Sequence, residues 1–193
     1  MIGAFTRWLG RLAGWRSEGA LPDLPRYVLI GAPHTSNWDC ILFLWAMAEL
    51  RFRPQWIGKH TLFFWPMGLL WRALGGIPVE RGARLNAVEQ TIERFRSSDR
   101  MVLVMSPEGT RRKTRGWKSG FYHIAQGAGV PVVPGLLDYS NRILRIGTPM
   151  YLTGDMEADL VPIRAFYATA RGHRAHLASD IALSERAPDD GGA

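Results

Sequence analysis

A histidine and an aspartate five positions apart, His34 and Asp39, are the pair in this sequence best suited to acid–base chemistry. They are the first and last residues of the segment HTSNWD, which lies between an apolar run and a stretch with helical periodicity. Side chains five residues apart on a helix point about 140° apart, so we predict His34 on a loop and Asp39 in the first turn of the helix. A carboxylate that binds one ring nitrogen fixes the imidazole tautomer and leaves the other nitrogen free to accept a proton. The alternative is a histidine beside a helix start, with Asp39 stabilising the helix dipole.

A second polar segment, SPEGTR at residues 106–111, follows the apolar run MVLVM at residues 101–105. The carboxyl ends of parallel strands share one edge of a sheet, where ligands bind, so we expect this segment beside His34. Gly109 would let a ligand approach the backbone closely, and Thr110 offers a hydroxyl. Cationic side chains follow at once: Arg111, Arg112, Lys113, Arg115 and Lys118. The pattern predicts an anion site, although a solvated basic loop or a nucleic-acid patch has the same composition.

Two more segments carry weaker signals. GGIPVER at residues 75–81 places Arg81 after a short apolar run, again at the carboxyl end of a predicted strand. VPVVP at residues 130–134 is typical of a buried strand bracketed by prolines, and packing alone is a sufficient explanation for it.

Apolar runs that alternate with helical periodicity surround these segments and predict the fold class. Strands are expected at residues 27–32, 55–58, 77–79, 101–105 and 130–137, with an edge strand at 143–146. Helices are expected at residues 37–50, 62–74, 83–96, 117–126 and 163–171. The alternation predicts an α/β fold with a mostly parallel central sheet flanked by helices on both faces.

Length and charge narrow the choice of function. The 193 residues suit one α/β domain, and 24 Lys and Arg against 17 Asp and Glu give a net charge of +7. Arginine binds phosphate and carboxylate through a planar fork of donors, so the excess points to an anionic partner. The single cysteine, Cys40, excludes a disulfide framework and any zinc site with two or more cysteine ligands.

The first twenty residues predict a short amphipathic helix. Apolar side chains recur at spacings of three and four, at Phe5, Trp8, Leu9, Leu12 and Trp15, and arginines fall between them. Tryptophan and arginine on one short helix suit a membrane surface, and a helix that packs on the domain is the alternative. No apolar stretch reaches the roughly 20 residues that a spanning helix needs.

Taken together, the four motifs resemble those of the lysophospholipid (glycerolipid) acyltransferase family. That family has H-x4-D, G-x-x-[FP]-[IV]-x-R, [FS]-P-E-G-T-R and V-P-[IV]-[IV]-P in this order. Here the same order runs through residues 34–39, 75–81, 106–111 and 130–134, within a resemblance that spans about residues 27–150. The stretch KHTLF at residues 59–63 also resembles a K-x-x-L-F segment of the family.

The resemblance implies an enzyme and gives each residue a role. His34 would deprotonate an acceptor hydroxyl that attacks the thioester of acyl-CoA or acyl-carrier protein, and Asp39 would orient His34. Backbone N–H groups near residues 131–134 would stabilise the oxyanion. No metal, cofactor or acyl-enzyme is implied. The acceptor would be a lysophospholipid, first of all 1-acyl-glycerol-3-phosphate, which becomes phosphatidate. The residues that would bind it are Lys59, Arg81, Glu108, Gly109, Thr110 and Arg111.

The sequence patterns and the resemblance together predict a domain division and a location. Residues 1–20 would be the helix on the membrane surface, 21–186 the acyltransferase domain and 187–193 a flexible tail. A peripheral bacterial enzyme on the cytoplasmic face of the inner membrane is expected, with no nucleic-acid partner. A different lysolipid or a hydroxyl acceptor without phosphate is the first alternative. A non-catalytic membrane module of the same fold and a nucleic-acid-binding domain are the others.

Overall fold

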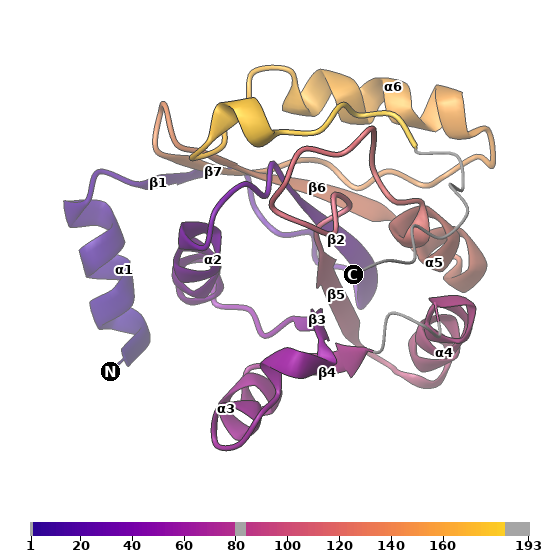
Figure 1. Ribbon diagram of the computed structural model, residues 1–193, viewed down its shortest axis with the longest axis horizontal. Coiled ribbons are helices and arrows are strands. Elements are labelled where there is room, and N and C mark those ends of the chain that lie inside the picture. Colours follow the sequence, from indigo (N-terminus) through magenta and orange to yellow (C-terminus); the bar gives the residue numbers. More distant parts are fainter. Residues whose placement is uncertain (1, 80–83, 184–193) are drawn as a thin grey trace, which may run out of the picture.

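A seven-stranded sheet organises the protein in its computed structural model, which describes residues 2–79 and 84–183 (Figure 1). The strand order is β1-β7-β6-β2-β5-β3-β4. Every neighbouring pair is parallel except β6 and β7, which are antiparallel. The strands are β1 (Arg16–Glu18), β2 (Arg26–Ala32), β3 (Gln55–Lys59), β4 (Gly76–Val79), β5 (Met101–Met105), β6 (Val132–Asp138) and β7 (Ile143–Ile146). The predicted fold class is confirmed.

Helices cover both faces of this sheet. The α-helices are α1 (Ile2–Leu12), α2 (Trp38–Glu49), α3 (Met67–Ala73), α4 (Arg84–Ser97), α5 (Gly120–Ala128) and α6 (Met156–Tyr167), and short 3-10 turns lie at η1 (His60–Leu62) and η3 (Ala175–Leu177). Helices α4, α5 and α6 pack on one face and α2 on the other, so that each face has its own core. Helix α1 lies outside the sheet and contacts α2.

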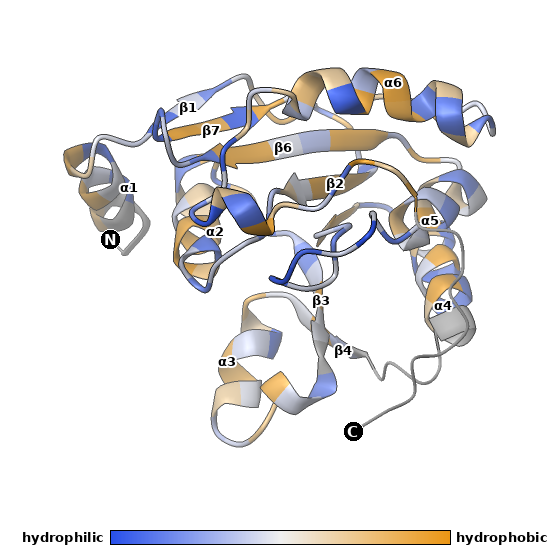
Figure 2. Cartoon of the chain, turned by 45° about the horizontal axis from the view of Figure 1, so that its top comes forward, coloured by the Kyte–Doolittle hydropathy of each residue, from blue (hydrophilic) through white to orange (hydrophobic). Residues whose placement is uncertain are grey.

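Strand β2 shows why the sheet is buried on both sides. Val28, Ile30 and Ala32 point to the core under α4, α5 and α6. Tyr27 and Leu29 point to the core under α2. Side chains alternate between faces along a strand, so a continuous apolar run is what a strand covered on both faces requires. Strand β6 beside it, and β7 on the far side of β6, are also largely hydrophobic (Figure 2).

The predicted strands agree with the structure more closely than the predicted helices. The helix expected at residues 62–74 is broken, because Pro66 has no N–H to donate and α3 begins only after it. The helix expected at 163–171 lies earlier, at Met156–Tyr167, because the Asp155 side chain caps its start by accepting from the Ala158 N–H at 3.1 Å. The helix expected at 117–126 begins only at Gly120, since Trp117 forms a bridge with Leu183.

One strand has a different place in the sheet from that expected. Strand β7 is not at the edge, because β1 pairs with it in parallel on its outer side. Strand β1 lies within residues 1–20, so the first segment of the chain contributes both the helix α1 and an outer strand.

Candidate active site

His34 and Asp39 meet at the carboxyl end of β2. Helix α2 begins at Trp38, so Asp39 lies in its first turn while His34 stays on the preceding loop. The Nδ1 atom of His34 is 3.0 Å from Oδ2 of Asp39. The backbone N–H groups of Thr35 and Ser36 donate to the same oxygen, each at 2.9 Å. The structure has the local geometry predicted from the spacing, with His34 on the loop, Asp39 in the first helical turn and Nδ1 as the nitrogen that contacts the carboxylate.

Tyr139, which the sequence did not single out, binds the other oxygen of Asp39. Its hydroxyl donates to Oδ1 at 2.6 Å, and its ring makes edge contacts with Trp15 and His173. Burial alone would raise the pKa of Asp39, but hydrogen bonds from His34, Tyr139 and the Ser36 backbone lower it below its usual value. Asp39 therefore stays ionised and can stabilise an imidazolium on His34.

Glu108 supports the loop that carries His34. It is 2% exposed, and its Oε2 accepts from the backbone N–H of His34 at 2.8 Å. Its Oε1 accepts from the Ser179 N–H at 3.4 Å. Burial raises the pKa of this carboxyl despite the hydrogen bonds from the two N–H groups. Both oxygens are thus engaged by the protein backbone, whereas the sequence suggested contact with a substrate.

Gly109, Thr110 and Arg111 form the turn that follows Glu108. Gly109 has φ +63°, a left-handed backbone conformation that favours glycine, and a Cβ there would lie 2.8 Å from Nζ of Lys118, whose flexible side chain would have to shift. The Thr110 hydroxyl accepts from the Arg112 N–H at 3.4 Å. The Arg111 guanidinium donates to Oδ1 of Asn37, which brings the turn against the start of α2.

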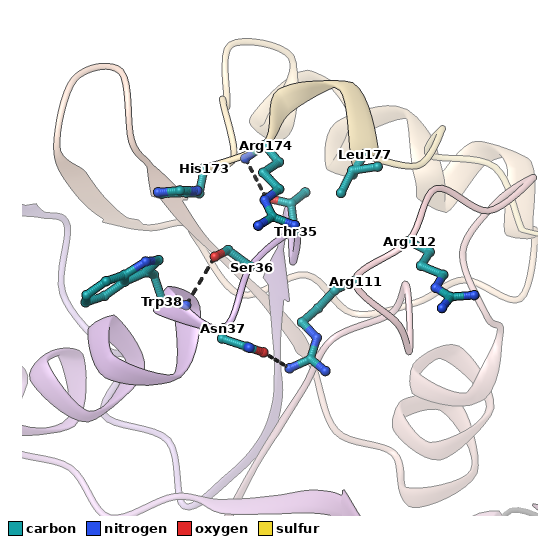
Figure 3. A pocket seen from close by; sticks show the side chains of 9 residues that line it. All are labelled: Thr35, Ser36, Asn37, Trp38, Arg111, Arg112, His173, Arg174 and Leu177. Atoms are coloured by element: carbon teal, nitrogen blue, oxygen red, sulfur yellow. Dashed lines mark hydrogen bonds between the residues drawn. The ribbon is translucent and has the colours of Figure 1, made fainter.

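An open cleft of about 340 Å³ lies against the segment that follows His34, from Thr35 to Trp38 (Figure 3). Its lining residues are Thr35, Ser36, Asn37, Trp38, Arg111, Arg112, His173, Arg174 and Leu177. The Arg174 N–H donates to the Thr35 hydroxyl at 3.1 Å and ties the segment before η3 to the loop that carries His34. Three arginines and no carboxylate line the cleft, so it suits an anionic ligand.

The remaining expected site residues lie at the same edge or outside the described part. Lys59 ends β3, which runs parallel to β5, and its backbone therefore lies at the carboxyl edge with His34. The Lys59 side chain and the whole of Arg81 lie outside the described residues. Among the described residues, no cluster of three or more His, Cys, Asp or Glu side chains could hold a metal ion.

The segment at residues 131–134 does not reach the site. Val132 pairs with Val28 and Pro134 with Ile30, so Val132 lies six residues upstream of His34 in the register. Six residues of strand span about 20 Å, and the Val132 N–H already donates to the Met150 carbonyl at 2.8 Å. The expectation that this segment supplies an oxyanion donor is therefore not supported.

Comparison with known proteins adds the family. The family model described as Acyltransferase matches residues 18–137, more than half of the chain. The chain belongs to this acyltransferase family. The matched range includes the His34–Asp39 pair, Glu108 and the turn after it.

Curated relatives of this acyltransferase chain carry one name. The 1-acyl-sn-glycerol-3-phosphate acyltransferase of Haemophilus influenzae is 32% identical over 147 residues, which cover 69% of this chain and 59% of that protein. The protein of the same name from Escherichia coli is 30% identical over 146 residues, covering 69% of this chain and 58% of that protein. The chain thus spans about three fifths of the length of these relatives.

A solved structure agrees in fold. The 1-acyl-sn-glycerophosphate (LPA) acyltransferase PlsC from Thermotoga maritima superposes with a TM-score of 0.61 at 20% identity, covering 90% of this chain and 82% of that one. The acyltransferase fold therefore extends well beyond residues 18–137. Tyr139, His173, Arg174 and Ser179 all lie in that later part, where no motif in the sequence marks them.

Proposed function

We propose that the protein transfers a fatty acyl group from acyl-CoA or acyl-carrier protein to the free hydroxyl of a lysophospholipid. The proposal rests on the 3.0 Å contact between His34 and the buried Asp39. Such a transfer needs a general base and a carboxylate that orients it, and these two residues can fill the two roles. The names of the relatives favour 1-acyl-glycerol-3-phosphate as acceptor and phosphatidate as product.

The reaction follows from the pair. Nε2 of His34 takes the proton of the acceptor hydroxyl as its oxygen attacks the thioester carbonyl, and the ionised Asp39 stabilises the resulting imidazolium. The tetrahedral intermediate collapses with cleavage of the carbon–sulfur bond. The imidazolium then returns its proton to the leaving thiolate, so the products are an ester and a free thiol. No covalent acyl-enzyme forms, because the acceptor itself supplies the nucleophile.

The cleft would hold the phosphate of the acceptor. Arg111, Arg112 and Arg174 line it without a competing carboxylate, and bidentate contacts from arginine position a phosphate well. Lys59 and Arg81 remain predicted as further contacts to this phosphate. Glu108 acts in this proposal as a positioning residue that holds the His34 backbone.

Helix α1 would place the enzyme at a lipid surface. Arg7 and Arg11 turn toward α2, where they bind the Ala48 carbonyl and the Glu49 carboxylate. The apolar side chains Phe5, Trp8, Leu9 and Leu12 are exposed instead. A helix that shows its apolar side to solvent suits a membrane interface. No helix in the described ranges is long and apolar enough to cross a bilayer. We propose peripheral association with the cytoplasmic face of the inner membrane.

A mass-spectrometric acyl-transfer assay tests the proposal. Detergent-solubilised protein receives acyl-CoA and a panel of lysolipids with and without a phosphate monoester, and acyl-carrier protein as a second donor. We expect phosphatidate from lysophosphatidate, and a loss of roughly a hundredfold to ten-thousandfold in His34→Ala. The exposed His123 on α5 offers a matched control, His123→Ala, that should keep the rate. A folded His34→Ala protein with the wild-type rate would refute the mechanism, and no product with either donor would favour a non-catalytic module.

A further inference from the structure

Beyond α1, a second exposed apolar surface lies on the segment from η1 through α3. Its outward side chains are Leu62, Phe64, Trp65, Leu69 and Leu70, and Trp65 is 83% exposed. Single exposed apolar residues are normal, but a contiguous group of this size marks an interaction site.

The segment that carries these exposed side chains is itself well packed against the protein. Phe63 and Trp71 turn inward and pack against Trp56 of β3, with ring centroids 5.9 and 5.8 Å from it. Gly68 is buried, and a Cβ there would overlap the Phe63 carbonyl, so helix α3 lies tightly on the turn before it. The inner aromatic side chains therefore hold the outer ones in place on the surface.

The charge of this part of the sequence favours an anionic partner. Between Glu49 and Glu80 the sequence contains no acidic residue. The cations in this interval are Arg51, Arg53, Lys59 and Arg72. The Arg72 guanidinium lies 5.6 Å from the Phe63 ring centroid. Exposed tryptophan and leucine, in a part of the sequence with basic and no acidic residues, match the interface of an anionic bilayer.

The arrangement of the helices connects this surface to α1. In both views α2 lies between α1 and α3 (Figures 1 and 2). The exposed start of α2 adds Trp38 and Ile41, 57% and 54% exposed, and Trp38 also lines the cleft. We call the exposed apolar side chains of α1, of the start of α2 and of the segment from η1 through α3 the apolar belt.

We propose that residues 60–73 form a second membrane contact, which acts together with α1 and fixes the cleft against an anionic lipid surface. The inference rests on the proposed function in one respect, that the acceptor is a lipid. Two membrane contacts on one rigid protein together bind more tightly than either contact alone, whereas a protein held by one contact could pivot on the surface. The belt would therefore hold the mouth of the cleft at the surface from which a lysolipid enters.

Sedimentation with vesicles of phosphatidylglycerol and phosphatidylcholine tests the contact. We expect the double variant Phe64→Ser/Trp65→Ser to partition roughly tenfold or more weakly than wild type, because two large apolar side chains no longer leave water. The matched control is Tyr151→Ser/Val161→Ser, which removes two side chains that are 66% and 60% exposed but lie outside the belt. The control should bind within about twofold of wild type.

A fluorescent probe reports the contact directly. In a Cys40→Ser background, a polarity-sensitive dye on Leu69→Cys should shift to the blue with vesicles, and the same dye on Tyr151→Cys should not. Equal sedimentation of wild type and Phe64→Ser/Trp65→Ser, with no shift at position 69, would overturn the proposal. Self-association in vesicle-free solution that the double variant abolishes, without an effect on vesicle binding, would overturn it in favour of a second copy of the chain.

The test separates this inference from the proposed function. The double variant Phe64→Ser/Trp65→Ser should acylate a short-chain, water-soluble lysolipid at the wild-type rate, because the substitutions leave the His34–Asp39 site unchanged. If wild type itself shows no acyl transfer, the proposed function fails while the sedimentation and dye results still decide on the membrane contact.

Discussion

Removal of a single hydroxyl, in Tyr139→Phe, tests how Asp39 is held. The substitution keeps the ring and its edge contacts with Trp15 and His173. It deletes one donor, 2.6 Å from Oδ1 of a carboxylate that is 5% exposed. A hydrogen bond to a charged group contributes about 2 kcal/mol, which corresponds to a fall of roughly 4–8 °C in Tm for a chain of this size.

The pH dependence of this loss follows from the pKa of Asp39. Because hydrogen bonds lower that pKa in the folded state, their stabilisation is fully present above the unfolded value of about 3.9 and is lost as the pH falls below it. The free energies of unfolding of wild type and Tyr139→Phe should therefore differ most near neutral pH and converge in acid. Urea unfolding at several pH values measures the difference.

Catalysis gives a second readout. Without the Tyr139 hydroxyl, Asp39 loses one of the groups that hold it in place against His34. If about half of the 2 kcal/mol is lost in the transition state, kcat/KM falls roughly fivefold. Tyr151→Phe, at an exposed tyrosine, is the control. An unchanged stability at neutral pH, or a deficit that persists undiminished in acid, would refute the role of the Tyr139 hydroxyl.

Three further changes have expected outcomes. Glu108→Ala leaves two backbone N–H groups without their acceptor and should lower the free energy of unfolding by about 2–4 kcal/mol in urea titrations. Its positioning role would be contradicted if this loss were smaller than the loss caused by the same substitution at an exposed carboxylate. Gly10→Leu drives a side chain into the indole of Trp45, so trypsin should cleave α1 faster than in wild type, and an unchanged rate would show that α1 does not rest there. Arg174→Ala should raise the acceptor KM roughly tenfold for lysophosphatidate and leave it unchanged for an acceptor without phosphate; equal effects on both would remove the assigned phosphate contact.

The sheet could be predicted because its signal is local. Strand β5 at Met101–Met105 and strand β7 at Ile143–Ile146 have the bounds that their apolar runs indicate. Whether β7 lies at an edge depends on β1, which is more than a hundred residues away in the sequence, and no local pattern carries that information.

The contact between His34 and Asp39 was predictable for the same reason, whereas the residues that support this pair were not. The spacing of His34 and Asp39 is set within one loop and one helical turn. Tyr139 reaches Asp39 from a hundred residues away. The motif around Glu108 gave the residue type, but its direction, toward the His34 backbone rather than a substrate, appears only in three dimensions.

Helix α1 illustrates a limit of periodicity. The pattern of Trp8, Leu9 and Leu12 predicted an apolar side and a polar side. It could not tell which side meets the protein. In the structure Arg7 and Arg11 contact α2. Helix α1 therefore packs on the domain through its arginines and at the same time exposes its apolar side.

The bond between Arg174 and Thr35 joins residues 139 positions apart and thereby sets the order in which the protein can mature. During synthesis, at about 5–20 residues per second, α1 and the His34–Asp39 pair leave the ribosome long before the segment that closes the cleft. Until then the Thr35 hydroxyl and one oxygen of Glu108 lack their partners from residues 174 and 179. If α1 binds a membrane, as proposed, the nascent chain can reach that membrane before its cleft exists. Attachment to the membrane would then precede assembly of the cleft.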